Sequence, residues 1–419
     1  MAVTLGCSLY LRGWITLAFA TFISCFPMVQ VAQAQTFTTL YTFVGSSDGA
    51  FPYSSLLRDS KGNLYGTASE GGVRTSGGFG TIFRIDSAGK FSVLYRFTGG
   101  ADGAFPMSTL ITDGISLYGT AQGDGYHGGS GVAFKLSWKG ETVLYTFSGG
   151  TDGDSASGTL MRDSAGNLYG TTMDGGNLSC QVGFGCGTVY QIDSSGAENV
   201  RYSFGDGADG GMPAYEALLR DSAGNLYGTT RWGGAQSCSL GCGTIFKVDP
   251  SGTETVLHSF SGTDGEWPEA GLVRDGAGNF YGTTAYGGDR QCNLPMGCGT
   301  VFRFDKTGHL TTIFQFHGSD GAFPFAPLVF DSAGNAYGTT YSGGVFGAGT
   351  IFKIDRHGSF SLLHSLNGSS DGANPYAGLI LDPSGNLYGT TVFFGGNGTG
   401  LCNVNGQKIS CGTVFKLTP

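Results

Sequence analysis

The sequence lacks the signals that most function classes require. Beyond residue 34 no stretch is apolar and long enough to cross a membrane, and no block of like charges appears, although the formal net charge is −9. Without a basic block, a nucleic-acid partner is not expected. No segment has a helical hydrophobic period over ten residues, which favours an all-β protein. Gly-x-Ser-x-Gly, His-Glu-x-x-His and phosphate-loop motifs are also missing, so no familiar catalytic centre is indicated.

The first 34 residues differ from the rest. Arg12 is the only charged residue before Asp48, and an apolar run extends over about 14–31. Residues 32–34 read Ala-Gln-Ala, an A-x-A cleavage pattern. We therefore predict a secretory signal peptide at 1–34 and a secreted, periplasmic or cell-surface protein.

Residues 35–419 are predicted to form a single exported domain, not transmembrane once the signal is cleaved. An uncleaved membrane anchor is the main alternative to cleavage. Attachment of a lipid to Cys25 is a weaker one, because residues 22–24 (Phe-Ile-Ser) make a poor lipobox.

What the sequence does have is glycine, at 77 of 419 residues, against a usual share of about 7%. Because no Gly-X-Y period accompanies it, this glycine indicates many tight turns between short strands. The 31 phenylalanines and 19 tyrosines supply material for a large core.

Four short patterns recur seven times at a spacing of about 50–58 residues. We name them strands d, a, b and c. Strand d is aromatic (first at 40–43, Leu-Tyr-Thr-Phe), and strand a is an apolar pair ending in Asp (first at 56–59). Strand b is Leu-Tyr-Gly-Thr (first at 64–67), and strand c is Gly-Thr-Ile-Phe (first at 80–83). Short Asp- and Gly-containing turns join a to b and c to d, as in hairpins.

Seven four-stranded units predict a seven-bladed β-propeller, with strands of four to seven residues. The mature chain opens with a d strand at about 36–43 and closes with a c strand at 412–417. The N-terminal strand is therefore expected to complete the last blade. An open solenoid would not need this complementarity. The longer, variable d–a and b–c loops share one face, where we expect any binding site.

The eight cysteines of the predicted mature chain fall in pairs within b–c loops. Local pairing in an exported chain favours four disulfides, whereas zinc would require ligands from separate blades to converge. The predicted pairs are Cys180–Cys186, Cys238–Cys242, Cys292–Cys298 and Cys402–Cys411.

Each d–a loop contains Asp-Gly, first at Asp48. Calcium could bind such carboxylates, but the Asp-x-Asp-x-Asp-Gly series is absent, so we interpret these aspartates as turn residues and predict no metal or cofactor. The tyrosine of strand b, present in all seven copies, is interpreted as a packing residue. Residues that differ between repeats are the informative ones.

Those irregular positions place aromatic and polar residues around the predicted channel mouth. The candidate binding residues are Tyr53, Tyr215, Arg231, Trp232, Trp267, Phe325 and Tyr376. Such a surface suits stacking on sugar rings or holding a peptide, and packing between blades is the alternative role. Glu216, Glu266 and Glu269 could serve acid–base sugar chemistry, though nothing sets their spacing. Of six scattered histidines, only His127 and His317 could reach this face.

The full repeat, D-x-x-G-N-L-Y-G-T-T-x-x-G-G followed by C-G-T-V-F-K-I-D and L-Y-x-F-x-x-x-D-G-x-x-P, resembles the GloVer tandem repeat of bacterial choice-of-anchor surface proteins. The resemblance covers essentially all of 35–419 and implies an exported propeller without an established activity. Members often carry a C-terminal sorting anchor, and this chain departs from them by ending directly after a c strand.

We therefore expect a monomeric binding module for a glycan or a protein. A polysaccharide lyase or hydrolase at the channel mouth and a structural envelope component are the alternatives. Fold alone does not choose among these three classes.

Overall fold

The computed structural model describes residues 35–72, 78–123, 130–180, 183–205, 207–235, 237–394, 402–404, 407–409 and 411–419. The predicted signal peptide lies outside these described residues. Residues 35–419 form one compact unit. Within the described part of the chain, no helix reaches the length and apolarity of a membrane span.

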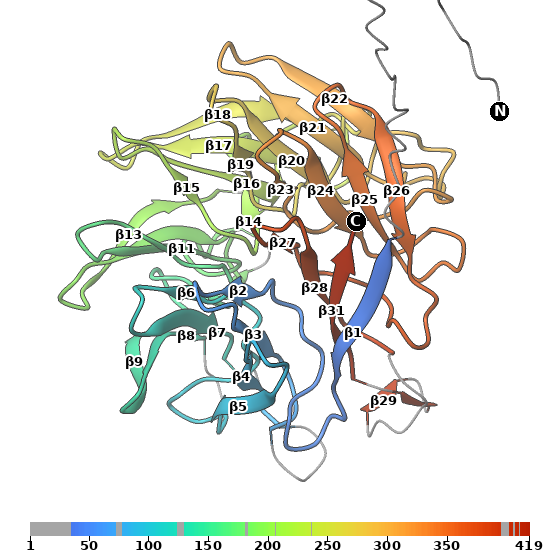
Figure 1. Cartoon of the computed structure of the whole chain (residues 1–419). Helices are drawn as coiled ribbons and strands as arrows, with labels where there is room; N and C mark the ends of the chain where they lie inside the picture. The colour runs from blue at the N-terminus through green and yellow to red at the C-terminus, as the bar shows by residue number, and fades with distance from the viewer. Residues whose placement is uncertain are drawn as a thin grey trace, which may run out of the picture. The chain divides into compact units, whose positions relative to one another are not determined.

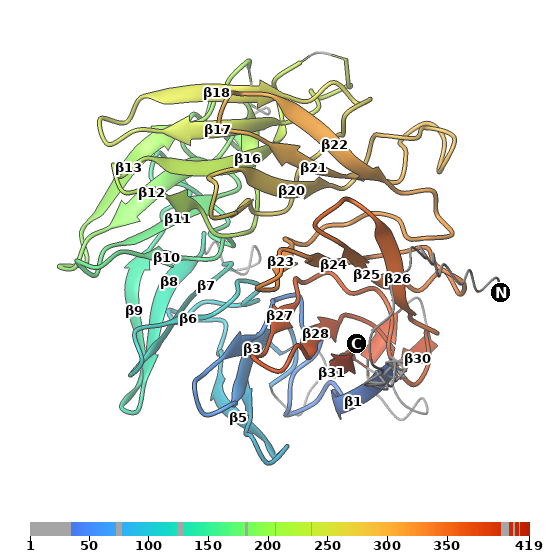
Figure 2. The same ribbon diagram turned by 45° about the horizontal axis from the view of Figure 1, so that its top comes forward.

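The described chain is all-β and forms seven antiparallel sheets, the blades of a propeller (Figure 1, Figure 2). Blade 1 contains β2 (Leu57–Arg58), β3 (Leu64–Ala68), β4 (Thr81–Ile85) and β5 (Phe91–Arg96). Blade 2 contains β6 (Ile111–Thr112), β7 (Leu117–Ala121), β8 (Val132–Ser137) and β9 (Gly140–Thr146). Blade 3 contains β10 (Met161–Arg162), β11 (Leu168–Thr172), β12 (Thr188–Ile192) and β13 (Glu198–Ser203). In each blade these strands correspond to a, b, c and d.

Blade 4 contains β15 (Leu219–Arg220), β16 (Leu226–Trp232), β17 (Thr244–Val248) and β18 (Glu254–Ser259), with β14 (Gly211–Pro213) also paired to β16. Blade 5 contains β19 (Val273–Arg274), β20 (Phe280–Thr284), β21 (Thr300–Phe304) and β22 (Leu310–Gln315). Blade 6 contains β23 (Val329–Phe330), β24 (Ala336–Thr340), β25 (Thr350–Ile354) and β26 (Phe360–Ser365).

Blade 7 joins the two ends of the domain, as predicted. It contains β27 (Ile380–Leu381), β28 (Leu387–Thr391), β31 (Thr413–Thr418) and, as its outer strand, β1 (Thr36–Thr42). Figure 1 shows the blue β1 beside the red β31. The separate hairpin β29 (Cys402–Val404) and β30 (Gln407–Ile409) lies in the b–c loop.

Strand a is shorter than predicted, with only two residues in every blade. Backbone groups of the residues before it also bond to neighbouring blades, while the Ser54 hydroxyl bonds to Thr67 of strand b. In blade 1 the Ser54 carbonyl accepts a hydrogen bond from Thr390, and the Ser55 amide donates to Thr109. The expected length of four to seven residues was therefore wrong for this strand, because its backbone groups serve ring contacts.

The motif Asp-x-x-Gly-Asn-Leu-Tyr closes on its own aspartate. In blade 4, Asp221 Oδ2 accepts hydrogen bonds from Asn225 Nδ2 at 2.7 Å and from the Tyr227 hydroxyl at 3.0 Å. Asp221 Oδ1 accepts two backbone amides, those of Ala223 and Asn225. The Tyr–Asp hydrogen bond occurs in all seven blades. The tyrosine, interpreted from the sequence only as packing, also fixes the a–b turn.

The glycine of Leu-Tyr-Gly-Thr makes room for the core ring of strand c. A Cβ on Gly228 would lie 2.7 Å from Phe246 Cζ and 2.9 Å from Leu218 Cδ2. The same close approach to the strand-c ring is found in every blade. This ring is fully buried and is phenylalanine in six blades and Tyr190 in blade 3. Each blade thus has one buried aromatic ring of strand c packed under strand b, and in most blades a ring of strand d meets it edge to face.

One hydrogen bond type links each blade to the next. The first threonine hydroxyl of strand b donates to a backbone carbonyl in the following d–a loop. The seven pairs are Thr67–Ser108, Thr120–Gly158, Thr171–Ala214, Thr229–Ala270, Thr283–Ala326, Thr339–Ala377 and Thr390–Ser54. Because the last pair joins blade 7 to blade 1, the hydrogen bonds run around the whole ring.

Candidate functional site

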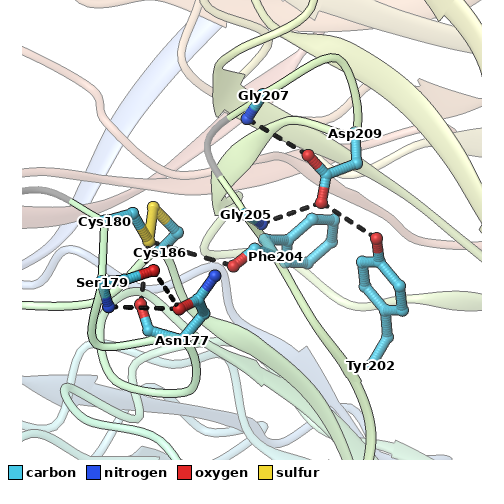
Figure 3. Close-up of a disulfide and its surroundings, with 9 residues drawn as sticks. All are labelled: Asn177, Ser179, Cys180, Cys186, Tyr202, Phe204, Gly205, Gly207 and Asp209. Atoms are coloured by element: carbon cyan, nitrogen blue, oxygen red, sulfur yellow. Dashed lines mark hydrogen bonds between the residues drawn. A yellow bond between two sulfur atoms is a disulfide. The ribbon is translucent and has the colours of Figure 1, made fainter.

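The four predicted disulfides are present, each within one b–c loop. They join Cys180 to Cys186, Cys238 to Cys242, Cys292 to Cys298 and Cys402 to Cys411. Figure 3 shows the first of them beside the d–a loop of the adjoining blade. The predicted pairing is therefore confirmed, and the disulfides tie the loops that surround the candidate site.

The d–a loop aspartates act as turn caps. Asp209 Oδ2 accepts hydrogen bonds from the Tyr202 hydroxyl at 2.9 Å and the Gly205 amide at 2.8 Å (Figure 3). At the end of blade 4 a histidine of β18 replaces the tyrosine: His258 Nε2 lies 2.8 Å from Asp264 Oδ2 in the following d–a loop. These contacts assign the aspartates to the scaffold. Across the described ranges, no three His, Cys, Asp or Glu residues are grouped as a metal site would need.

Each d–a loop also contains one non-glycine residue with positive φ, between 52° and 59°. These residues are Phe51, Phe105, Ser155, Met212, Trp267, Phe323 and Asn374. The backbone amide of each donates to a carbonyl of the previous strand-c segment; for Trp267 the acceptor is Cys242 at 3.0 Å. The scaffold therefore holds this strained conformation seven times, while the side chain it presents varies.

A small cavity lies where the d–a loops meet around the ring axis. Its lining residues come from six of the seven blades and are Tyr53, Met107, Tyr215, Glu216, Glu269, Phe325 and Tyr376. We call it the channel cavity. Its interior of about 20 Å³ holds no more than one or two water molecules. The channel is therefore nearly closed at this level, and a sugar ring does not fit inside.

Beside the channel cavity, residues from three blades converge on Glu269. Arg231 Nε lies 3.0 Å from Glu269 Oε1, an ion pair whose N–H is not aligned for a hydrogen bond. The Tyr376 hydroxyl donates to Glu269 Oε2 at 3.3 Å. The Arg231 guanidinium also lies 4.5 Å from the ring centre of Trp267 and 5.7 Å from that of Trp232. Sequence positions as distant as 269 and 376 are thus brought into contact.

Burial shifts the titration of both cavity carboxylates. Burial raises the pKa of Glu269, whose side chain is 5% exposed, while Arg231 and the Tyr376 hydroxyl oppose the shift. Burial also raises the pKa of Glu216 to about 7, opposed only by the Thr159 hydroxyl. Part of the Glu216 surface remains accessible even though protein surrounds its carboxylate.

Aromatic rings form a continuous cluster around these carboxylates. Phe325 stacks on Tyr376 at 4.9 Å, and Tyr53 and Tyr341 meet Tyr376 edge to face at 5.4 and 6.2 Å. Burial raises the pKa of the Tyr53 hydroxyl to about 12, so the tyrosines stay neutral at physiological pH. Because the rings support one another, they present a fixed surface.

The structure thus places four of the candidate binding residues, Tyr53, Tyr215, Phe325 and Tyr376, on one cavity, with Arg231 and Trp267 next to it. Trp232 does not line the cavity, and its buried Nε1 has no hydrogen-bond acceptor among the described residues.

Sequence reasoning left Met107 out of the candidates and gave Glu216 and Glu269 no defined position. Alignment of the residue after the loop proline would have found Met107 and Glu269, because that residue lines the channel in five blades.

Of the two histidines expected to reach this face, the structure describes His317, which does not line the channel cavity. His317 bonds to the loop aspartate Asp320 through its backbone amide at 2.8 Å and through Nδ1 at 3.3 Å. It therefore serves as a turn cap. His127 lies outside the described residues.

Large apolar side chains are exposed on the b–c loops. Within the disulfide-closed loops, Phe184 is 73% exposed, Leu240 51% and Leu294 76%; in blade 6, Val345 and Phe346 are 74% and 64% exposed. Exposed apolar groups of this kind mark interaction surfaces.

The repeat pattern of the Gloeobacter/Verrucomicrobia repeat matches residues 28–237 and 180–403, which together span most of the sequence. The chain belongs to the Gloeobacter/Verrucomicrobia repeat family. This confirms the resemblance drawn from the repeat motifs. A search of curated proteins finds no match.

Solved structures share the fold of this repeat-family propeller. A fungal alcohol oxidase, solved in complex with copper, aligns with a TM-score of 0.56 at 14% identity, over 92% of this chain and 77% of the oxidase. The extracellular domain of the putative one-component system BT4673 from B. thetaiotaomicron aligns with a TM-score of 0.51 at 12% identity, over 90% of this chain and 39% of that protein. The chain thus spans well under half of the latter. At these identities the comparisons establish architecture alone.

Proposed function

We propose that this chain is an exported β-propeller that binds a glycan or a protein on the d–a/b–c face, around the channel cavity. One observation carries the proposal. Residues that differ between blades converge there, with Arg231 and Tyr376 both in contact with Glu269, whereas the repeated residues are used by the scaffold. Exposed apolar loop residues on the same face add contact area for a macromolecule.

Export is supported by two features. Four disulfides are typical of a protein in an oxidising compartment. The apolar segment before residue 35 fits a cleaved signal peptide. We do not propose nucleic acid as a partner, because the chain is acidic and has no basic block.

The test is a binding screen of residues 35–419 against immobilised glycans, soluble polysaccharides and envelope proteins, read for both retention and product release. The diagnostic variant is Trp267→Ala. The matched control is Trp138→Ala, because Trp138 is 84% exposed on a c–d turn of blade 2, at the opposite end of the strands. We expect retention that falls at least tenfold in Trp267→Ala and is unchanged in Trp138→Ala. Equal effects of the two variants would contradict the proposed face.

A second function, polysaccharide hydrolysis or elimination, is favoured by the two carboxylates at the channel cavity. Glu216, with its pKa near 7, could donate a proton, and Glu269 could accept one. The small cavity requires such a substrate to react above it rather than within it. Product release in the same screen would decide for this function, and absence of both retention and release would favour a structural envelope component.

A further inference from the structure

The channel cavity contains one carboxylate that the described part of the chain does not pair with a cation. Glu269 is neutralised by Arg231 at 3.0 Å. Glu216 receives only the Thr159 hydroxyl, at 3.4 Å. Because that hydroxyl is neutral, an ionised Glu216 has a negative charge that nothing in the cavity compensates.

The walls of the channel cavity suit a cation. Four aromatic rings line it, and aromatic faces attract ammonium and guanidinium groups, most strongly where water is excluded. Next to the channel cavity, the protein already holds one of its own cations between an aromatic ring and a carboxylate. The Arg231 guanidinium lies 4.5 Å from the Trp267 ring centre while it pairs with Glu269.

The size of the cavity limits the cation. A space of about 20 Å³ admits a group the size of one or two waters, which matches a primary ammonium. A trimethylammonium group or a sugar ring with an attached amine is too large. A hard metal ion would want six or more oxygen ligands, and the cavity offers two carboxylates.

We propose that the channel cavity binds the primary ammonium group of a lysine side chain presented by a protein partner, with Glu216 as its counter-ion. The slender four-carbon stem of lysine can carry an ammonium group into a narrow opening, which a ring-bound amine cannot. The net charge of −9 and the exposed apolar b–c loops fit a partner segment that is both basic and apolar. This inference rests on the proposed function and selects protein over glycan as the ligand.

The experiment is calorimetric titration of residues 35–419 at pH 8 with Nα-acetyl-lysine N-methylamide. Three further probes define the chemistry: the uncharged norleucine analogue, the ε-trimethylated lysine analogue, and glucosamine. The diagnostic variant is Glu216→Gln, which is nearly isosteric. The matched control is Glu198→Gln on the outer strand β13. Burial also raises the pKa of Glu198 to about 7, but Glu198 lies beside the scaffold residue Asp152 and does not line the channel cavity. Near-UV circular dichroism checks that both variants fold.

We expect saturable binding of the lysine probe, at least tenfold weaker binding of the other three probes, and at least a tenfold loss in Glu216→Gln with no change in Glu198→Gln. Equal binding of the norleucine analogue, or an unchanged affinity in Glu216→Gln, would overturn the inference. A second variant, Met107→Phe, narrows the cavity without altering charge and should also abolish binding. If a glycan is retained in the screen and the lysine probe does not bind, this inference fails while the proposed function stands.

Discussion

The Thr390 hydroxyl in blade 7 donates a hydrogen bond to the Ser54 carbonyl in blade 1, 3.2 Å away and 336 positions earlier in the sequence. It closes the inner ring of blade-to-blade hydrogen bonds. The outer closure is the pairing of β1 with β31, reinforced by Phe37 stacking on Phe415 at 5.1 Å. The two ends of the domain are therefore held together both at the inner strands and at the outer strand of the ring.

Removal of β1 tests the outer closure. Deleting residues 35–42 should abolish the cooperative unfolding transition and cause aggregation, because the hydrogen-bonding edge of β31 becomes exposed. Thermal unfolding and size-exclusion chromatography measure both effects. A synthetic peptide of residues 35–43 added in trans should restore a monomeric, folded species. Thr390→Val, which removes one hydrogen bond, should cost only about 1 kcal/mol of unfolding free energy. A fully folded, monomeric deletion protein would show that β1 is dispensable.

Tyr190 is the one core ring of strand c with a hydroxyl, and that hydroxyl is buried with no hydrogen-bond partner in the part of the chain that the structure describes. Tyr190→Phe should therefore raise the unfolding free energy by about 1–3 kcal/mol, the usual cost of an unsatisfied buried polar group. Urea denaturation followed by fluorescence measures the change. Phe246→Tyr, which introduces the same hydroxyl into blade 4, should lower stability by a similar amount. Destabilisation by Tyr190→Phe would mean that a buried water satisfies the hydroxyl.

Gly228→Ala should destabilise the protein by about 1–3 kcal/mol, because the new methyl group would meet Phe246 and Leu218 at under 3.0 Å. Denaturation midpoints of the purified variant give the value. Gly276→Ala is the control, because a Cβ there would have no atom within 4 Å. Adding Phe246→Leu to Gly228→Ala should recover part of the loss. If the two glycine variants are equally stable, close packing under strand b is not what requires glycine.

Stability should be greatest near roughly pH 4–5. Burial raises the pKa of Glu216 to about 7, above its ordinary 4.5, so its contribution is fully present at low pH and is lost as pH rises through 7. Burial alone would raise the pKa of Asp221, but the hydrogen bonds from Asn225 and Tyr227 outweigh burial and lower this pKa from its ordinary 3.8. The stability that the ionised Asp221 contributes is therefore lost as pH falls below 3.8.

Thermal midpoints between pH 3 and 8 test this profile, and Glu216→Gln should flatten its neutral side. A midpoint that rises steadily from pH 5 to pH 8 would contradict the assignment.

The sequence alone determined the parts of this protein that depend on neighbouring residues. The turn at Asp221, the pairing of Cys238 with Cys242 and the number of blades all follow from short motifs repeated at a regular spacing. Ring closure was also predictable, because a d strand at one end of the chain complements a c strand at the other. The two-residue length of strand a was not, since its backbone groups bond to other blades.

The site, in contrast, was decided by tertiary structure. Seven-fold closure points one residue of most d–a loops at the ring axis, and so brings Glu269 into contact with Arg231, 38 positions away, and with Tyr376, 107 positions away. No local pattern encodes those separations. The sequence could show that these residues break the repeat, but their meeting at one small cavity follows from the geometry of the closed ring, which places non-equivalent loops side by side.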